Sequence, residues 1–281
     1  QKLDGIFAFA LYDQEQKLML LARDPMGVKP LYYTTTINNG FLFASETGAI
    51  LKHPSFKIKP DLDAIRSSLI LNLLASQEST WYKDIYPLEP GHALLFSKGS
   101  VTPRKLKFRT PPEPLTNITY GDACEKIRQT LIDAVKLQRL SDVGYAVTLS
   151  GGIDSAAVAA ILSNESDRPL CAFSIRYEES KPGTPDFEDL QHAKLLAERY
   201  ANLELQTVNI SAAQLMTEEI INKFTSCFDG TIPIDYRTLA LMGLYPRTHD
   251  QGVKVVLTGQ GADEMWMGYY DHPIYPFWNY P

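Results

Sequence analysis

The chain has 281 residues, of which 44 % are hydrophobic and 21 % are charged, with 3 cysteines and a formal net charge of −6. This length suggests two domains, and the hydrophobic share excludes a disordered chain. The charges are uneven: residues 1–110 carry 14 basic and 10 acidic side chains, whereas residues 111–281 carry 13 and 23. An acidic half is a poor partner for nucleic acid or an anionic membrane, and it would need a cation in order to bind phosphates.

No apolar run approaches the roughly 18 residues that a membrane-spanning helix needs, and the first residues given do not form the apolar h-region of a signal peptide. Cys124, Cys171 and Cys227 are too far apart for a disulfide framework or a CxxC metal site. Such cysteine usage fits a reducing compartment, so we expect a cytoplasmic protein.

Short apolar runs separated by polar or glycine-containing breaks predict four strands, at 6–12, 17–22, 31–35 and 41–44. Asn39-Gly40 between the last two is typical of a hairpin turn, because both residues tolerate positive φ. A helix is predicted over 61–75, since apolar residues recur on one face: Leu62, Ile65, Leu69 and Leu73. We therefore expect an antiparallel sheet packed against helices.

A proline-rich stretch, Phe108–Pro114, interrupts this pattern and coincides with the change in charge. It predicts a first domain at 1–108, a linker at 109–118 and a second domain at 119–281. In the second domain, helices alternate with buried strands, which predicts a doubly wound parallel sheet. Thr119 with Asp122 three residues later is typical of a capped helix start. Helices are predicted at 120–140, 155–162, 187–200, 212–224 and 237–245, and strands at 145–149, 171–175, 205–208 and 254–257.

The run Ser150-Gly151-Gly152-Ile153-Asp154-Ser155 stands between a predicted strand and a predicted helix. Strand, glycine-rich turn and helix start, in this order, make an anion site. The two glycines let a phosphate approach the backbone, and the two serines add hydroxyl donors. The carboxylate of Asp154 would repel phosphate unless Mg²⁺ lies between them; alternatively, Asp154 and Ser155 only cap the helix. The absence of GxxxxGK[ST] disfavours a kinase or GTPase that acts on the γ-phosphate.

A second glycine-rich run, Thr258-Gly259-Gln260-Gly261-Ala262-Asp263-Glu264, follows the last predicted strand. Ligands bind at the carboxyl ends of strands in open parallel sheets, where both runs lie. Asp154 and Asp263 together can share one Mg²⁺. Taken alone, the second run is also compatible with an ordinary turn with a capping aspartate. The pair of runs favours a nucleotide site.

These runs resemble a known family. SGGIDS (150–155) is similar to the pyrophosphate loop of ATP-pyrophosphatases, which cleave ATP between the α and β phosphates. TGQGADE (258–264), followed by Met267-Gly268-Tyr269, resembles a signature of the glutamine-dependent asparagine synthetases. Four runs of the first domain resemble the second half of that family's glutaminase domain: LDGIFAFA (3–10), RDPMGVKPLY (23–32), ASE (44–46) and LEPGH (88–92).

The resemblance implies a mixed α/β and α+β fold. The C-terminal half of an N-terminal-nucleophile αββα sandwich would precede a doubly wound ATP-pyrophosphatase domain, in a fragment that lacks both ends. It also implies an ATP-dependent, Mg²⁺-dependent ligase that adenylates a carboxylate, aspartate in asparagine synthetases. Ammonia from glutamine then displaces AMP, giving asparagine, AMP and pyrophosphate. The resemblance is compatible with a homodimer and implies no nucleic-acid or membrane partner.

By position in the family's motifs, Ser150, Gly151, Gly152, Asp154 and Ser155 would hold pyrophosphate and Mg²⁺, and Asp263 would be the second metal ligand. Thr148, Ile175, Thr258 and Gly259 match positions that contact the AMP part.

Three departures limit the resemblance. Gln1 is not the family's nucleophilic cysteine, and the family's glutamine-binding residues have no counterpart here, so we expect no glutaminase activity from the chain as given. The family's catalytic lysine, which comes well after the run 258–264, also has no counterpart in the given sequence. Gln260, which would contact the substrate, stands where asparagine synthetases commonly have glutamate, and a neutral amide is no general base. The loop 229–235 lacks an arginine found in those enzymes. Two alternatives stay open: a sister amidotransferase or ring-closing ligase acting on another carboxylate, and a non-catalytic nucleotide-binding protein.

Overall fold

The computed structural model describes residues 3–37, 40–71, 79–97, 102–109, 115–139, 141–165, 168–227, 236–266 and 268. Several predicted features lie outside these ranges: Asn39 of the hairpin turn, residues 72–75 of the helix, the prolines 111–114, the loop 229–235, and residues 267 and 269. The chain divides into two compact units, residues 1–115 with 222–234 and residues 116–221 with 235–281. The limits 109–118 of the linker stay a prediction. None of the described helices combines the length and apolar composition needed to cross a membrane.

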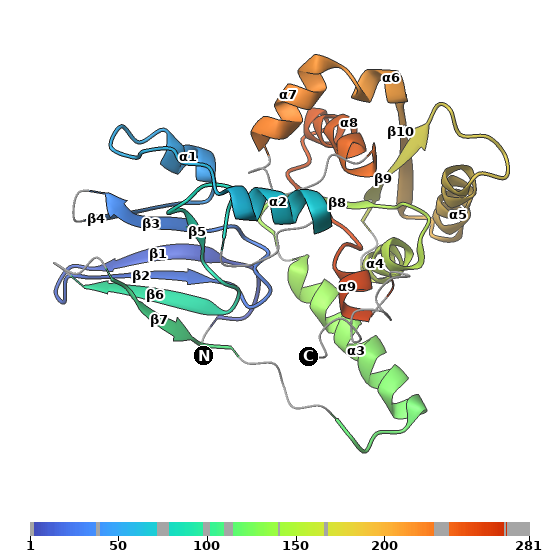
Figure 1. Ribbon diagram of the computed structural model, residues 1–281. Helices are drawn as coiled ribbons and strands as arrows, with labels where there is room; N and C mark the ends of the chain where they lie inside the picture. Colours follow the sequence, from blue (N-terminus) through green and yellow to red (C-terminus); the bar gives the residue numbers. More distant parts are fainter. Residues whose placement is uncertain are drawn as a thin grey trace. The chain divides into compact units, whose positions relative to one another are not determined.

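The first unit is built on two antiparallel sheets (Figure 1). One has the strand order β1-β2-β6-β7, made of Ala8–Asp13, Leu18–Arg23, His92–Ser97 and Arg104–Lys107. The other has the order β4-β3-β5, made of Gly40–Ala44, Tyr32–Ile37 and Tyr86–Pro87. Phe41 of β4 stacks on Phe96 of β6 with ring centroids 3.7 Å apart, so aromatic side chains join the two sheets.

All four predicted strands of this unit are present, which confirms the antiparallel sheet. The sequence analysis missed β5, β6, β7 and the short helix α1, Thr47–Leu51. The predicted helix is α2, Leu62–Leu71, but its predicted buried face is wrong. Leu62 and Leu69 are exposed, whereas Ala64 and Ser68 are buried. On the buried face, Ser68 Oγ accepts a hydrogen bond from the Trp81 Nε1–H at 2.8 Å, which gives the indole a polar partner.

The run 23–32 forms a loop that is fixed by two charged side chains. Asp24 is buried, and its carboxylate accepts hydrogen bonds from the backbone amides of Met26, Val28 and Lys29 at 2.9–3.1 Å. Arg23 donates to three carbonyl oxygens at 2.7 Å, those of Gly27, Lys29 and Leu88. Burial lowers the pKa of the Arg23 guanidinium, which nearby negative charge partly offsets. In the run 23–32, the charged residues that carry the family resemblance therefore stabilise the structure of the loop.

The second unit contains one parallel sheet with the strand order β10-β9-β8-β11. The strands are β8 Tyr145–Thr148, β9 Leu170–Tyr177, β10 Leu203–Ile210 and β11 Val255–Leu257. The main helices are α3 Tyr120–Gln138, α4 Ile153–Asn164, α5 Pro185–Arg199 and α8 Tyr236–Asp250. The prediction of a doubly wound parallel sheet is confirmed. Thr119 caps α3 as predicted, its hydroxyl accepting from the Asp122 amide at 3.2 Å.

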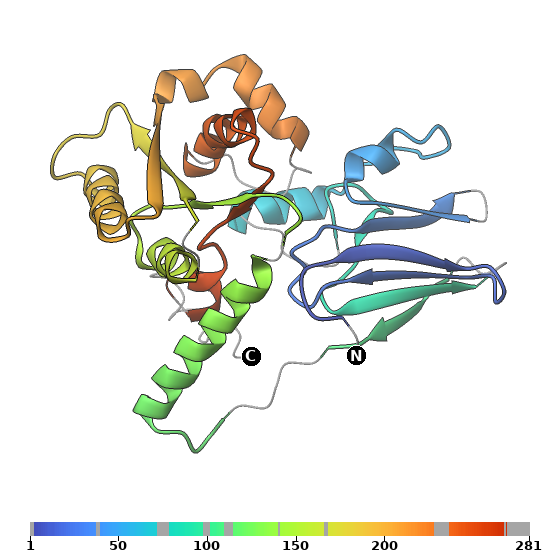
Figure 2. The ribbon, with the colours of Figure 1, turned by 180° about the vertical axis from the view of Figure 1, so that it is seen from behind.

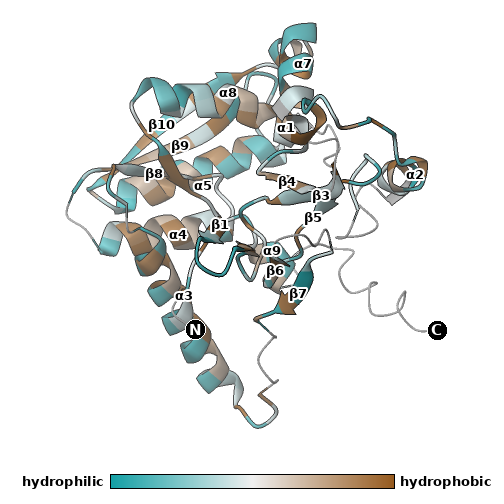
Figure 3. Cartoon of the chain, turned by 90° about the vertical axis from the view of Figure 1, so that its left-hand side faces the viewer, coloured by the Kyte–Doolittle hydropathy of each residue, from teal (hydrophilic) through white to brown (hydrophobic). Residues whose placement is uncertain are grey.

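Helices cover both faces of this sheet (Figures 1 and 2). On one face, Val135, Val158 and Ala193 of α3, α4 and α5 pack with Val147 of β8. On the other face, Leu244 of α8 packs with a different set of strand side chains, Ala146 and Phe173. Hydrophilic and hydrophobic residues both occur along α3 (Figure 3), and Val135 near its C-terminal end is buried, whereas Tyr120 and Ile127 are exposed.

Three shorter helices complete the described part of this region. The helix predicted over 212–224 is two helices, α6 Ala212–Leu215 and α7 Glu218–Cys227. Thr217 separates them, because its hydroxyl accepts from the Ile220 amide at 3.4 Å and starts the second helix. The helix α8 continues through Pro246 to Asp250, whereas the prediction ended it at residue 245. The helix α9, Ala262–Trp266, was not predicted.

Candidate functional site

The strand order of the parallel sheet reverses between β8 and β11. The chain proceeds from β8 through β9 to β10 on one side, and β11 joins the opposite edge of β8. Such a reversal leaves a crevice beyond the carboxyl ends of the two strands. The two glycine-rich runs of the sequence, 150–155 and 258–264, begin at these strand ends.

The first run turns directly into α4 through a set of short hydrogen bonds. The hydroxyl oxygens of Ser150 and Ser155 lie 2.9 Å apart, the Ser150 amide donates to Ser155 Oγ at 3.2 Å, and Ser155 Oγ donates to the Gly152 carbonyl at 3.1 Å. Ser155 is buried and therefore shapes the loop. The N-cap is Gly152, which has no side chain to cap the helix, so neither Asp154 nor Ser155 occupies the capping position. The first amides of α4 thus have no side-chain cap and can bind an anion.

The second run lies directly against the start of α4. A β-carbon at Gly259 would be 2.7 Å from the Ser155 backbone nitrogen and 3.0 Å from Asp154 Cβ, closer than a side chain can approach. The backbone N–H of Gln260 donates to Thr258 Oγ1 at 3.3 Å. Two segments more than a hundred residues apart therefore form one continuous surface.

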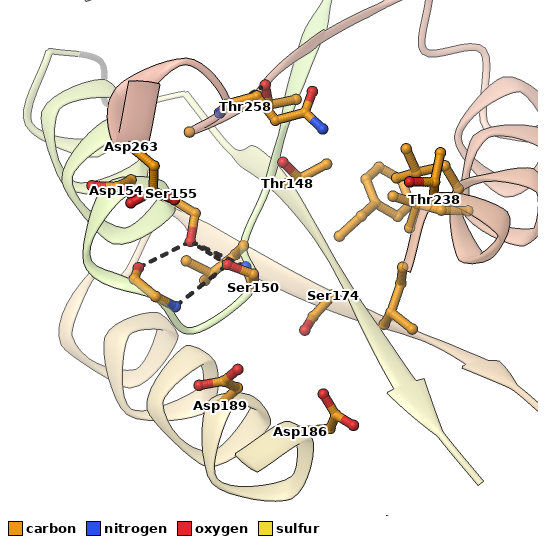
Figure 4. A pocket seen from close by; sticks show the side chains of 18 of the residues that line it. Thr148, Ser150, Asp154, Ser155, Ser174, Asp186, Asp189, Thr238, Thr258 and Asp263 are labelled. Carbon is orange, nitrogen blue, oxygen red and sulfur yellow. Dashed lines mark hydrogen bonds between the residues drawn. The ribbon is translucent and has the colours of Figure 1, made fainter. Parts of the chain in front are cut away.

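This surface lines a pocket of about 640 Å³ (Figure 4). Ten of the eleven site residues predicted from the sequence line it: Thr148, Ser150, Gly152, Asp154, Ser155, Ile175, Thr258, Gly259, Gln260 and Asp263. The eleventh, Gly151, does not line the pocket; it packs against the backbone of Asp189 in α5.

The sequence analysis missed the side chains that α5 and α8 contribute. Asp186 and Asp189 line the pocket from the start of α5, which follows β9. Apolar and hydroxyl-bearing residues line it from α8: Thr238, Leu241, Leu244 and Tyr245. The helical spacing of the α8 residues was visible in the sequence, but nothing in that spacing says which helix crosses the carboxyl ends of the strands. Glu264, Ser174 and Tyr177 also belong to the lining.

The pocket is strongly acidic. Its described lining contains five carboxylates, those of Asp154, Asp186, Asp189, Asp263 and Glu264, and no lysine, arginine or histidine. Burial, together with the negative charges of Asp263 and Glu264, raises the pKa of Asp154. Within the described ranges, no three acidic, histidine or cysteine side chains converge into a complete metal site. The acidic rim therefore fits a cation that takes part of its coordination from a ligand such as phosphate.

Comparison with protein-family models gives two matches. Residues 126–280 match the asparagine synthase model, and residues 1–107 match the glutamine amidotransferase domain. The two models together cover both units of the chain.

Curated relatives agree with these matches. The chain is 37 % identical over 182 residues to asparagine synthetase [glutamine-hydrolyzing] 3 of Bacillus subtilis, covering 63 % of the chain and 29 % of that protein. It is 30 % identical over 278 residues to asparagine synthetase [glutamine-hydrolyzing] 1 of the same organism, covering 97 % and 41 %. It is 28 % identical over 283 residues to the amidase chry2 of Gibberella zeae, covering 95 % and 40 %. The chain thus spans less than half the length of these relatives.

Among solved structures, the NH3-dependent NAD synthetase of Campylobacter jejuni pairs with 52 % of the chain and 60 % of its own, at 22 % identity and a TM-score of 0.34. The family assignment rests on the two sequence models, whose order along the chain follows the two units. The chain belongs to the asparagine synthase family.

Proposed function

We propose that the chain is part of an ATP-dependent amide-forming ligase. The ligase adenylates a carboxylate and transfers glutamine-derived ammonia to it, releasing AMP and pyrophosphate. One observation carries the proposal: the loops 150–155 and 258–264 meet in one pocket at the strand-order reversal, with Gly259 packed on Asp154. A carboxylate is a poor electrophile, and adenylation supplies it with a good leaving group.

The pocket offers separate surfaces to the two ends of ATP. The uncapped start of α4 and the amides around Gly152 suit the phosphates. Ile175, Leu241 and Tyr245 form an apolar wall that suits the adenine base. The loop lacks the lysine of a Walker motif, which is consistent with cleavage between the α and β phosphates.

Asp154 and Asp263 are the carboxylates that would hold Mg²⁺ against the phosphates. Burial, and after it the negative charges of Asp263 and Glu264, raises the pKa of Asp154, and a cation between the two aspartates would stabilise their charged forms. When bound, the ion would neutralise charge on the phosphate oxygens of the leaving pyrophosphate. The residues of the chain then bind ATP, orient its α-phosphate toward the carboxylate substrate, and keep the base in the apolar part of the pocket.

Aspartate is the first carboxylate to test, because asparagine synthetases are prominent among the relatives. Gln260 favours a second candidate, another carboxylate. Its side chain lines the pocket as a neutral amide, and fungal amidases are also among the relatives.

The test is ATP–pyrophosphate exchange by the full-length protein with a panel of carboxylates. The proposal expects Mg²⁺-dependent exchange that requires one carboxylate or a narrow group of them. Exchange with aspartate alone would remove the second candidate. Tight binding of Mg²⁺-ATP without exchange for any carboxylate would contradict the proposal and favour a nucleotide-binding protein without catalysis.

A further inference from the structure

The described pocket contains a second pair of carboxylates that the proposed reaction does not yet use. Asp186 and Asp189 are three residues apart on α5, so they share one face of the helix. Both line the pocket and both are partly buried. Neither side chain has a hydrogen-bond or ion-pair partner in the described part of the chain. The helix dipole stabilises the negative charge of Asp186 in the first turn of α5, but Asp189 lies beyond that turn.

A largely buried serine faces the same part of the pocket. Ser174 of β9 is 3 % exposed and lines the pocket. Its hydroxyl has no hydrogen-bond partner within the described ranges and is open to the pocket, since it is not among the buried unpartnered atoms. Figure 4 shows Ser174, Asp186 and Asp189 around one region, while Asp154 and Asp263 lie on the other side of Ser150.

Asp186 and Asp189 place two negative charges on the side of the pocket against which the loop 150–155 packs. Phosphates bound to the loop 150–155 lie beside α5, because Gly151 packs on the backbone of Asp189. A cation between Asp154 and Asp263 leaves the negative charges of Asp186 and Asp189 unscreened, and no described lining residue is basic. Mg²⁺ accepts one or two carboxylates, a serine hydroxyl and phosphate oxygens as ligands.

We infer that Ser174, Asp186 and Asp189 form a second divalent-cation site, which binds the nucleotide's phosphates from the α5 side of the pocket. The inference rests on the proposed function, because the nucleotide supplies the remaining ligands. The first cation, between Asp154 and Asp263, and the second then hold the phosphates from two sides. The β9–α5 connection, rather than either glycine-rich run, supplies the second site.

The test counts Mn²⁺ bound to the full-length protein with α,β-methylene-ATP, which cannot be cleaved between the α and β phosphates. Electron paramagnetic resonance measures free Mn²⁺, and equilibrium dialysis measures bound nucleotide. We expect two Mn²⁺ per bound nucleotide in the wild type and one in the Asp186→Asn/Asp189→Asn variant. Nucleotide affinity should fall by roughly tenfold or more in that variant. Without a cation at this site, removing two negative charges would instead strengthen nucleotide binding.

Two further variants make the result specific. Ser174→Ala should weaken the second Mn²⁺ and leave the first unchanged, and it leaves the charge of α5 intact. Glu198→Gln, which removes an exposed charge from the last turns of α5, should keep two Mn²⁺. One Mn²⁺ per nucleotide in the wild type, or two in the double variant, would overturn the inference while leaving the proposed function standing. Failure of the wild type to bind nucleotide would instead contradict the proposed function.

Discussion

Gly151 lies so close to Asp189 that a β-carbon on the glycine would be 1.9 Å from the Asp189 carbonyl oxygen. Gly151 also has a φ of +95°, which L side chains rarely adopt. The loop 150–155 therefore packs directly on the backbone of α5.

The neighbouring glycines should consequently respond differently to alanine. Gly151→Ala is expected to destabilise the second unit by at least about 2 kcal/mol, through backbone strain and the clash with α5. The β-carbon added by Gly152→Ala would lie 3.5 Å from Ser150 Oγ, which is an ordinary contact. This variant should therefore fold normally. It should still weaken nucleotide binding, since its methyl group would stand where a phosphate approaches the backbone. Thermal unfolding and nucleotide titration of both variants check the pair; equal melting temperatures would contradict the proposed packing.

Gly259→Ala tests whether the two glycine-rich runs act as one surface. The new methyl group would press on the Ser155 nitrogen at 2.7 Å, so β11 and its loop must move away from α4. We expect nucleotide affinity to fall by about tenfold or more, with a smaller loss of stability than in Gly151→Ala. Gly121→Ala in α3 is the control, because a β-carbon there meets nothing within 4 Å. Unchanged affinity in Gly259→Ala would separate the second run from the site.

The sequence determined the ends of the strands well enough to place both glycine-rich runs on the pocket. Strand periodicity and glycine spacing are local signals, and they locate Asp154 and Asp263 without any tertiary information. Asp186, Asp189 and the α8 residues were missed because their role depends on which helix passes the strand ends. No local pattern reports that arrangement.

The same distinction explains the error in α2. Periodicity favoured Leu62 and Leu69 as the buried face, but the folded helix buries Ala64 and Ser68, and Ser68 there accepts a hydrogen bond from Trp81. In the loop 23–32, the sequence showed a family pattern but not its cause. The cause is a buried carboxylate that satisfies three backbone amides, which only the folded loop brings together.

Asp24→Ala should therefore be among the most damaging substitutions in the first unit. It leaves three backbone amides without their acceptor, so we expect a loss of at least about 3 kcal/mol in the free energy of unfolding. Asp63→Ala is the matched control, since Asp63 makes only an exposed ion pair with Arg66. Chemical denaturation monitored by tryptophan fluorescence measures both. Similar unfolding midpoints for the two variants would show that the Asp24 bonds contribute little.

Gln260→Glu should change the choice of carboxylate more than it changes the affinity for ATP. The substitution adds a negative charge to a pocket that already carries five carboxylates, at a residue placed beside Thr258. We expect the ratio of exchange rates between an acidic and a neutral carboxylate substrate to shift by about tenfold, or about 1.4 kcal/mol. ATP–pyrophosphate exchange with the carboxylate panel measures that ratio, and Gln251→Glu, outside the pocket, is the control. An unchanged ratio would mean that Gln260 does not contact the carboxylate.

Asp154→Asn should separate stability from nucleotide binding. Burial and the charges of Asp263 and Glu264 raise the pKa of Asp154 in the folded protein. Its charged form therefore opposes folding. The stability of the ligand-free protein should fall as pH rises from the ordinary aspartate pKa through the raised value, and level off above it. The asparagine variant lacks this charge, so at neutral pH it should be at least as stable as the wild type.

Binding of Mg²⁺-ATP should follow the opposite trend. A cation needs the charged carboxylate, so wild-type affinity should rise with pH across the same window in which stability falls. The Asp154→Asn variant should lose Mg²⁺-dependent ATP binding at every pH while it remains folded. Isothermal titration in Mg²⁺ and in EDTA, with melting curves over the same pH range, measures both trends. A variant that binds Mg²⁺-ATP with wild-type affinity would remove Asp154 from the metal site, whereas a variant that merely unfolds would contradict the sign of the pKa shift.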